Sequence, residues 1–204
     1  MSDRLPTFLR SCRGPLGGSA SEWQIKGDES VVVAFANQCH WDELQALFDC
    51  ESDGDLVVAN DVTSCGRIYR IALSANHMVG GLVYESIRSK NAIVLRDIAV
   101  RRAWQRTRIA SSLLASIVQQ RNEWREPTEQ SQRSFDMVMA PKPDAYELKG
   151  FLTASGFKTV RTNEYNDVLP MDAHGELYKA SILLPGTNPE PQAYRLGSSV
   201  IRDR

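Results

Sequence analysis

The sequence predicts one α/β domain in which helices flank a central mixed, mostly antiparallel sheet. Three observations predict this class. A β-branched apolar run over 93–100 leads through a polar turn into an amphipathic helical pattern that starts at Ile109. Two alternating runs separated by a turn, 67–73 and 79–84, precede this unit, and a shorter strand–helix–strand pattern over 135–160 follows it. The antiparallel start excludes a simple doubly wound fold, in which strands and helices alternate throughout.

Composition sets limits on the partners. The chain has 204 residues, of which 42% are hydrophobic, enough for one sizeable core. A formal net charge of −1 gives no global reason to expect nucleic acid or an anionic membrane as partner. There is no charged and then apolar leader and no run of about 18 apolar residues, so we expect a cytoplasmic protein without a membrane partner. The cysteines Cys12, Cys39, Cys50 and Cys65 form no Cys-x-x-Cys pair, so we expect reduced thiols and no metal site.

The N-terminal part divides into an arm and the start of the domain. Residues 1–28 contain several glycines and serines without periodic apolar residues, so we expect a flexible arm outside the core. The domain proper is expected over 29–184 and opens with a strand over 31–35. A helix that begins near Asp42 follows, and turn residues over 51–55 end it. Its apolar face consists of Trp41, Leu44, Leu47 and Phe48.

The hairpin predicted over 67–84, just before the central strand over 93–100, contains an unusual glycine pair. Asn76-His77 is the expected turn between its two strands. Gly80-Gly81 lies inside the returning strand, which indicates a bulge or a close approach of another part of the protein to the backbone. A turn over 89–91 then leads into the central strand.

After the central helix, which is expected to end near Trp124, the elements become shorter. Gly156 is placed to end the last helix in the left-handed conformation. The expected elements are a strand over 135–140, a helix over 144–155, strands over 157–160 and 177–184, and a tail over 185–204.

Two motifs resemble signatures of the Gcn5-related N-acetyltransferase (GNAT) superfamily. The run 105–110, Gln-Arg-Thr-Arg-Ile-Ala, resembles that family's acyl-coenzyme A motif, Gln/Arg-x-x-Gly-x-Gly/Ala, and leucines follow it in the helix. The run 151–157, Phe-Leu-Thr-Ala-Ser-Gly-Phe, resembles the second signature, in which an apolar-aromatic pair precedes Gly-Phe. Both motifs fall on the expected elements in the family's order, and the resemblance covers roughly residues 31–184. It implies the GNAT acyl-CoA N-acyltransferase fold.

The resemblance also implies a site for acetyl-CoA, or another acyl-CoA, as co-substrate. In the family the coenzyme lies where the central strand and its following helix diverge from the next strand. Its pantetheine amides would pair with the strand edge formed by Ile98, Ala99 and Val100. The pyrophosphate would lie on the helix start, where backbone amides lack intrahelical partners and the helix dipole favours an anion. The residues concerned are Gln105, Arg106, Thr107, Arg108, Ile109, Ala110 and Ser111.

The implied reaction is direct transfer of the acyl group to a primary amine, with a general base that removes the amine proton. Asp97 on the central strand and Glu85 at the end of the preceding strand are the candidate bases, and a water relay is an alternative. Leu152 occupies the place of a tyrosine that many family members use as general acid, which leaves that role open. The acceptor would be an amine-bearing small molecule or protein, and a homodimer is left open.

Two alternatives remain at this stage. Arg108 replaces the first motif glycine, where its side chain would either crowd the pyrophosphate or pair with it. Together with Leu152 it suggests a degenerate member of the family that binds or regulates without catalysis. Alternatively, a basic turn with one tryptophan among its residues would suit nucleic acid, although its place at a helix start favours coenzyme phosphates. That turn contains Arg101, Arg102, Trp104, Arg106 and Arg108.

Overall fold

A computed structural model describes residues 20–24, 30–52, 66–123, 134–160, 165, 169, 176–184 and 195–196. In this part of the chain nine strands form one sheet, in the order β1-β2-β3-β4-β5-β6-β8-β7, with β9 pairing with β8. The strands are β1 (Ala20–Gln24), β2 (Ser30–Phe35), β3 (Arg67–Ser74), β4 (His77–Ile87), β5 (Ala92–Val100), β6 (Ser134–Met139), β7 (Lys158–Val160), β8 (Leu177–Leu183) and β9 (Arg195–Leu196). The helices are α2 (Trp41–Glu51), α3 (Ile109–Glu123) and α4 (Tyr146–Ala154), with short 3₁₀ turns at Gln38–His40, Arg88–Lys90 and Arg102–Trp104.

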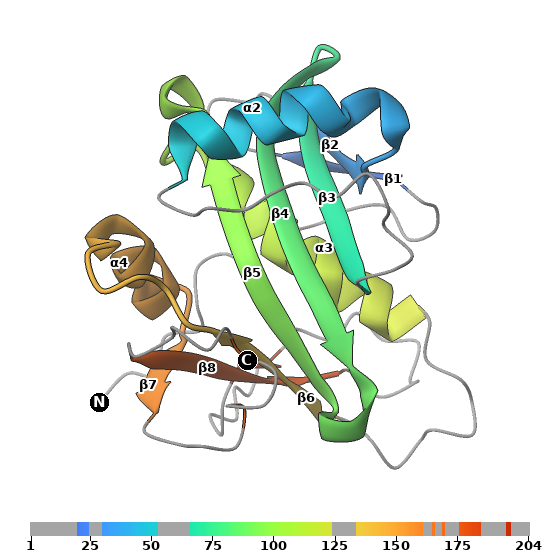
Figure 1. Ribbon diagram of the computed structural model, residues 1–204. Helices are drawn as coiled ribbons and strands as arrows, with labels where there is room; N and C mark the ends of the chain where they lie inside the picture. Colours follow the sequence, from blue (N-terminus) through green and yellow to red (C-terminus); the bar gives the residue numbers. More distant parts are fainter. Residues whose placement is uncertain are drawn as a thin grey trace, which may run out of the picture.

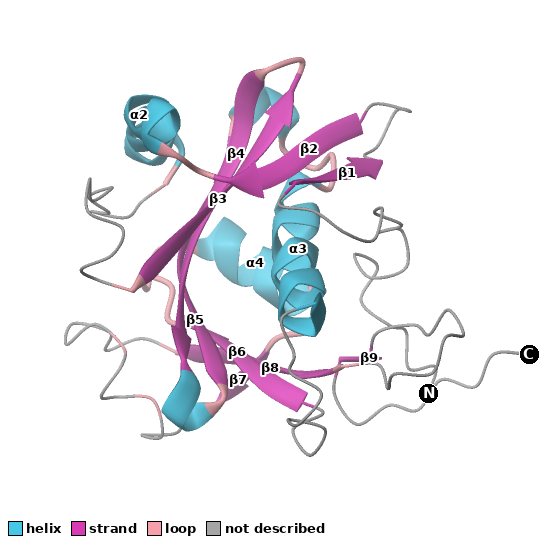
Figure 2. Cartoon of the chain, turned by 90° about the vertical axis from the view of Figure 1, so that its right-hand side faces the viewer, coloured by secondary structure: helices cyan, strands magenta, loops and turns pink. Residues whose placement is uncertain are grey.

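The sheet is covered on both faces, as Figures 1 and 2 show. Helix α2 crosses one face near one end of β3, β4 and β5, while α3 and α4 lie on the other face. The α3 face carries the larger core, in which Leu113, Leu114 and Ile117 of α3 pack with Leu82, Leu95 and other strand residues. The α2 face carries a smaller core that includes Leu44, Phe48, Ile71 and Val83. The mixed sheet with flanking helices confirms the predicted fold class.

The glycine pair of β4 lies between these two helices. A Cβ atom on Gly80 would come within 2.8 Å of Ile109 in α3, and one on Gly81 within 2.6 Å of Leu44 in α2. The β3–β4 register also shifts between Ala72 and Leu73. The glycine pair predicted a bulge or a close approach, and the structure has a register shift beside the pair as well as close contacts at both glycines.

The local signals at turns and helix ends are largely confirmed. Gly156 has φ of 92°, and the amide of Phe157 donates to the carbonyl of Leu152 at 3.0 Å, which closes the C-terminus of α4. The β3–β4 turn is formed by Ala75 and Asn76, one residue earlier than expected. Both have positive φ, of 47° and 66°, as a two-residue turn that matches the twist of the strands requires.

The N-terminal region differs from the expectation of an arm outside the core. Residues Ala20–Gln24 form β1, which pairs antiparallel with β2, and Trp23 is only 3% exposed. The single tryptophan side chain supplies the apolar area that holds this strand in place, without a run of alternating residues. The sheet thus begins before residue 29, where the sequence places the start of the domain. Residues 1–19 and 25–29 lie outside the described part.

Candidate functional site

Strand β5 has one edge that its neighbour leaves open. It pairs antiparallel with β4 along its whole length, but parallel with β6 only from Ala92 to Val94. Beyond this point β5 and β6 diverge (Figure 1), and no other described strand pairs with the far end of that edge. The segment Ile98–Val100, which the resemblance assigns to pantetheine, lies on this far end. The divergence is the geometry that the resemblance implies.

A β-bulge precedes the open edge. Val83 pairs with Asp97 and Tyr84 with Leu95, so Arg96 is an extra residue in β5. Because of the bulge, two consecutive side chains contact residues on the α2 side of the sheet. Arg96 contacts Glu85 of β4, and Asp97 contacts Ser52 at the end of α2. Without the bulge, the strict alternation of a strand would turn one of them towards the α3 face.

The carboxylate of Asp97 joins the open edge to the end of α2. One oxygen accepts a hydrogen bond from the hydroxyl of Ser52 at 2.5 Å, and the other accepts from the amide of Ile98 at 2.7 Å. Ser52 is the C-cap residue of α2. Asp97 is 6% exposed, which makes it one of the few buried charged groups in the described part. Hydrogen bonds of this kind offset the cost of removing a polar side chain from water.

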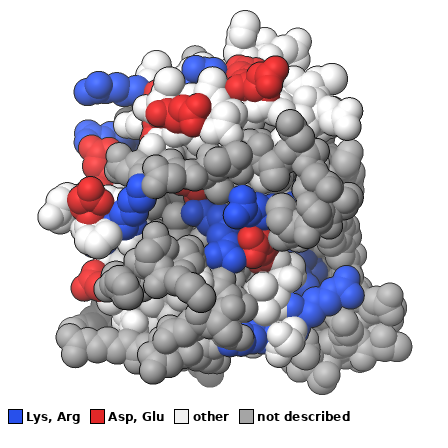
Figure 3. All heavy atoms as spheres, in the orientation of Figure 1, with Lys and Arg blue, Asp and Glu red and all other residues white. Residues whose placement is uncertain are grey.

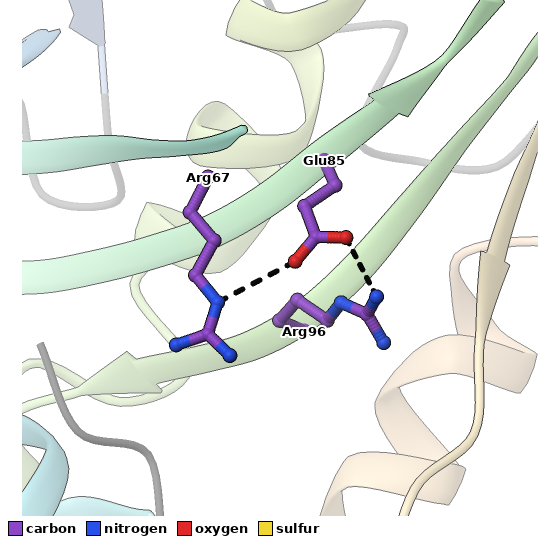
Figure 4. Close-up of polar contacts among 3 residues, drawn as sticks. All are labelled: Arg67, Glu85 and Arg96. Atoms are coloured by element: carbon purple, nitrogen blue, oxygen red, sulfur yellow. Dashed lines mark hydrogen bonds and ion pairs between the residues drawn. The ribbon is translucent and has the colours of Figure 1, made fainter. Parts of the chain in front are cut away.

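Glu85, the other candidate base, lies between two arginines (Figure 4). One carboxylate oxygen is 2.6 Å from a terminal nitrogen of Arg96, and the other is 3.4 Å from Nε of Arg67. The three side chains are 15% to 31% exposed. They come from the three neighbouring strands β3, β4 and β5. We call Arg67, Glu85 and Arg96 the arginine–glutamate cluster.

The turn before α3 has the backbone of a glycine-rich loop. Arg106 and Arg108 have φ of 63° and 79°, in the left-handed region that side chains other than glycine rarely adopt. Both side chains are exposed. Turns that mix left-handed and right-handed residues direct successive amides to one side, where they form an anion-binding concavity. Arg108 therefore occupies the motif glycine's place and also has a glycine-like conformation.

Several predicted coenzyme residues already have local partners. The hydroxyl of Thr107 donates to the carbonyl of Trp104 at 2.5 Å, and the side-chain amide of Gln105 donates to the carbonyl of Val100 at 3.2 Å. These bonds fold the turn back onto the end of β5. Ile109 is 1% exposed and belongs to the core, so only its backbone is available to a ligand. Ala110 and Ser111 are partly exposed at the start of α3.

The basic residues of the turn do not share one role. Arg101 donates from Nε to the carbonyl of Met78 at 2.6 Å and forms an ion pair with Glu43 of α2 at 3.2 Å. The Arg102 side chain is exposed, while its amide donates to Glu51. The contacts of Arg101 tie the turn to α2. Its guanidinium thus has a structural role, which weakens the basis for a nucleic-acid surface.

The tyrosine position of the family is occupied by core. Leu152 is fully buried in α4 and packs in the core of the α3 face. Tyr146 begins α4 and is 77% exposed. The buried Tyr165 donates to Asp136 of β6 at 2.7 Å; burial, together with this bond to a carboxylate, raises the pKa of Tyr165 to about 12. A phenol with this pKa is a poor proton donor at neutral pH.

Arg67, Arg96 and Ser52 were not predicted as site residues. In β3, Arg67 alternates with Tyr69 and Ile71, so the three side chains lie on one face of the strand. This alternation is the one local pattern that indicates where the Arg67 side chain lies. Ser52 and Asp97 are 45 residues apart in the chain, and no local pattern connects them.

The described residues contain no group of three or more histidine, cysteine, aspartate or glutamate side chains placed to hold a metal ion. None of the helices in the same part of the chain has the length and apolar character needed to cross a bilayer.

Comparisons with known proteins identify the fold. A scan against protein-family models and a search of curated proteins both return no match. Among solved structures, the chain is similar to the GNAT domain of PAT from S. lividans, with a TM-score of 0.54 and 14% identity over 78% of this chain and 95% of that one. It is also similar to Ard1 from Thermoplasma volcanium, with a TM-score of 0.53 and 13% identity over 76% and 99% of the two chains. A GNAT-family acetyltransferase from Staphylococcus aureus Mu50 gives 0.52 and 14%, over 73% and 97%. The chain has the GNAT fold.

Proposed function

We propose that this protein is an acyl-CoA-dependent N-acyltransferase that transfers an acyl group, acetyl in the simplest case, to a primary amine. One observation carries the proposal. Beyond Val94, none of the described strands other than β4 pairs with β5, and the turn that follows β5 has Arg106 and Arg108 in the left-handed conformation. A backbone edge that offers amides and carbonyls next to an anion-binding turn suits a ligand with an amide chain at one end and phosphates at the other.

The pantetheine arm would pair with Ile98–Val100, and the pyrophosphate would lie on the amides of residues 106–110. Some bonds of the present structure compete with this arrangement, since Asp97 accepts from the amide of Ile98 and Gln105 donates to the carbonyl of Val100. Binding would exchange these local bonds for bonds to the coenzyme. The exposed guanidinium of Arg108 would add a charge-assisted bond to a phosphate oxygen, and the hydroxyl of Ser111 could add another.

Asp97 is the proposed general base. Bound acyl-CoA supplies the acyl group in activated form, as a thioester. The amine nitrogen forms a bond to the thioester carbonyl carbon, and the carbon–sulfur bond breaks with release of the thiolate. Asp97 takes the amine proton, directly or through a water. Its carboxylate is positioned by Ser52 and by the amide of Ile98, within the segment of β5 proposed to bind pantetheine, whereas the carboxylate of Glu85 forms ion pairs with two arginines.

Calorimetric titration with acetyl-CoA and a thiol-release assay test the proposal together. We expect binding in the micromolar range, and thiol release that depends on an added amine. Absence of binding at millimolar coenzyme would refute the enzyme reading. The two alternatives predict other results. A non-catalytic GNAT module would bind coenzyme without releasing thiol. A nucleic-acid-binding protein would retard RNA or DNA in an electrophoretic mobility assay, and this effect would depend on Arg102. The buried Leu152, which supplies no acid, is the observation that keeps the non-catalytic reading in the test.

A further inference from the structure

The amide of Ile98 lies on the open edge of β5, where the proposed base holds it. The amide of Arg101 donates to the carbonyl of Val79 in β4 at 3.0 Å. In an antiparallel ladder the backbone groups of alternate residues point to opposite edges, so those of Ile98 and Val100 point away from β4. The amide of Ile98 donates to one carboxylate oxygen of Asp97, Oδ1, at 2.7 Å. The donor that would bind pantetheine is therefore engaged by the residue that would take the amine proton.

The end of α2 holds the other carboxylate oxygen of Asp97. This oxygen, Oδ2, accepts from the hydroxyl of Ser52 at 2.5 Å. The amide of Ser52 donates to the carbonyl of the buried Phe48 at 3.0 Å, which closes the helix. The neighbouring Glu51 accepts from the amide of Arg102 at 3.0 Å and so joins the end of α2 to the turn after β5. Ser52 thus holds Oδ2 from a packed helix and not from the open edge.

The two oxygens of Asp97 would fare differently when coenzyme binds. A pantetheine carbonyl that accepts from the amide of Ile98 would take that donor away from Oδ1. The bond from Ser52 to Oδ2 would stay, because Ser52 belongs to α2. A hydrogen bond to a carboxylate favours its ionised form, so loss of the bond at Oδ1 favours uptake of a proton there.

We propose that coenzyme binding activates the base. Acyl-CoA takes the amide of Ile98, Oδ1 of Asp97 gives up this bond, and Ser52 is the positioning residue that keeps the carboxylate in place. The amine proton then passes to Oδ1 as the nitrogen–carbon bond forms, and the carbon–sulfur bond breaks with release of the thiolate. This inference rests on the proposed acyltransfer and adds the device that links its base to its coenzyme.

Two variants of Asp97 test the exchange through binding alone. Asp97→Asn keeps an oxygen that can accept from the amide of Ile98, whereas Asp97→Ala has none. Calorimetry with acetyl-CoA, without an amine, measures both. If the coenzyme must displace this acceptor, its Kd should be about threefold to tenfold lower for Asp97→Ala than for Asp97→Asn, the range expected for one intramolecular hydrogen bond. Equal Kd values, or weaker binding by Asp97→Ala, would overturn the exchange.

The comparison of these two variants controls for charge. Arg96 of the arginine–glutamate cluster directly precedes Asp97, and Figure 3 shows basic side chains gathered near the centre of the α2 face, with an acidic side chain beside them. Loss of a carboxylate affects such groups and also the attraction of an anionic coenzyme. Both variants lose the same charge, so this effect is common to them. Thermal melts show whether each is folded, and Asp97→Leu, which also lacks an acceptor, replaces the alanine variant if that fails to fold.

Variants of Ser52 test its positioning role. Ser52→Ala should lower kcat for thiol release about tenfold or more and leave the Kd of acetyl-CoA within about twofold, because the base loses its support while the coenzyme loses no contact. Ser52→Thr keeps the hydroxyl and should restore most of kcat. Ser89→Ala, which removes an exposed hydroxyl before β5, is the matched control and should change neither value. An unchanged kcat in Ser52→Ala, or a threonine variant as slow as the alanine variant, would remove Ser52 from this role.

The outcomes separate this inference from the proposed function. If acetyl-CoA does not bind the unmodified protein, both are wrong. If acetyl-CoA binds and an amine releases thiol, but the two Asp97 variants bind coenzyme equally, the function stands and the exchange is wrong. Tighter binding by Asp97→Ala without thiol release by any amine would overturn the function and, with it, the role of the exchange in catalysis.

Discussion

The two ends of β5 differ in almost every property. At the start of the strand, Ala92–Val94 pair with β4 on one side and with β6 on the other, and all three side chains are buried and apolar. At its end, Ile98–Val100 pair with β4 alone among the described strands, and the preceding bulge introduces Arg96 and Asp97. The first end has its backbone groups satisfied within the sheet. The second leaves groups on one edge for other partners.

This difference gives the two ends of one strand different roles in the proposed function. Parallel pairing with β6 holds the first end rigidly in a buried sheet. The same pairing stops after Val94, and no other described strand pairs with that edge of the second end. A fixed end next to an open one gives a ligand site a rigid support.

The largest expected effect concerns the open end. Asp97→Asn should lower kcat by about a hundredfold or more, because the amide cannot take the amine proton. The asparagine oxygen can still accept from the amide of Ile98, and its NH2 group can donate to the hydroxyl oxygen of Ser52, so the fold and the Kd of acetyl-CoA should change little. Steady-state thiol release and calorimetry measure the two quantities. Glu85→Gln makes the same chemical change on the neighbouring strand and should lower kcat less than Asp97→Asn does. A larger decrease of kcat in Glu85→Gln would assign the base to Glu85.

The second-largest effect tests the packing of α2 against β4, next to the open end of β5. Gly81 pairs with Ala99, and Gly81→Ala should lower the free energy of unfolding by about 1–3 kcal/mol, since the new methyl overlaps Leu44. Gly150→Ala is the matched control. No atom outside its own helix lies within 4 Å of that Cβ position in α4, so this change should stabilise the protein by about 0.5–1 kcal/mol. Urea denaturation of both variants decides; equal shifts would contradict the close packing.

Arg108→Gly separates stability from ligand binding at the turn beside the open end. The variant should be more stable by up to about 1 kcal/mol, because glycine adopts φ of 79° without strain. Its affinity for acetyl-CoA should fall about tenfold through loss of a phosphate contact. Arg108→Lys keeps the charge and should lose less affinity. Tighter binding by the glycine variant would mean that the arginine side chain obstructs the site.

The smallest effect concerns the paired end, where Asp136 of β6 lies opposite Ala92. Burial would raise the pKa of the Asp136 carboxyl, but bonds from Lys179, Ser181 and Tyr165 hold that pKa below its usual value. A carboxyl with a lowered folded-state pKa adds stability above the unfolded pKa of about 3.9, and this stability is lost as the pH falls through the folded value.

Asp136→Asn should therefore lower stability at pH 7 by less than about 1 kcal/mol, because solvent screens the partly exposed ion pair. The difference from the unmodified protein should shrink below pH 4. Denaturation at a series of pH values measures it, with Ser181→Ala as a milder change in the same direction. A difference that persists undiminished at pH 2 would show that the carboxylate charge is not involved.

Most of the fold could be predicted because its signals are local. The strand β5 and the helix α3 follow from runs of β-branched residues and from helical spacing, and Gly156 ends α4 as its position indicated. The strand β1 could not be predicted in this way. Its place depends on one buried tryptophan, Trp23, and on pairing with a strand that follows it.

The candidate site was only partly predictable. The motif residues of the turn and both carboxylates were identified from the sequence, and the structure brings them to the same region around β5. Their partners were not identified: Ser52 reaches Asp97 from the end of a helix, and Arg67 reaches Glu85 across β3 and β4. Such pairs depend on strand register and helix placement, which no local pattern records.

By itself, then, the sequence determined most elements of this protein, though not β1, because side-chain period and turn chemistry act over a few residues. It also predicted an anion site at the turn before α3, because the proposed donors belong to one continuous segment. Only the tertiary structure decided that the pairing of β5 with β6 ends after Val94. It also decided that a bulge at Arg96 brings Arg96 to Glu85 and Asp97 to Ser52, and that a second arginine, Arg67, contacts Glu85. These features arise from pairing between distant segments, where sheet register and packing, rather than local preference, determine which groups meet.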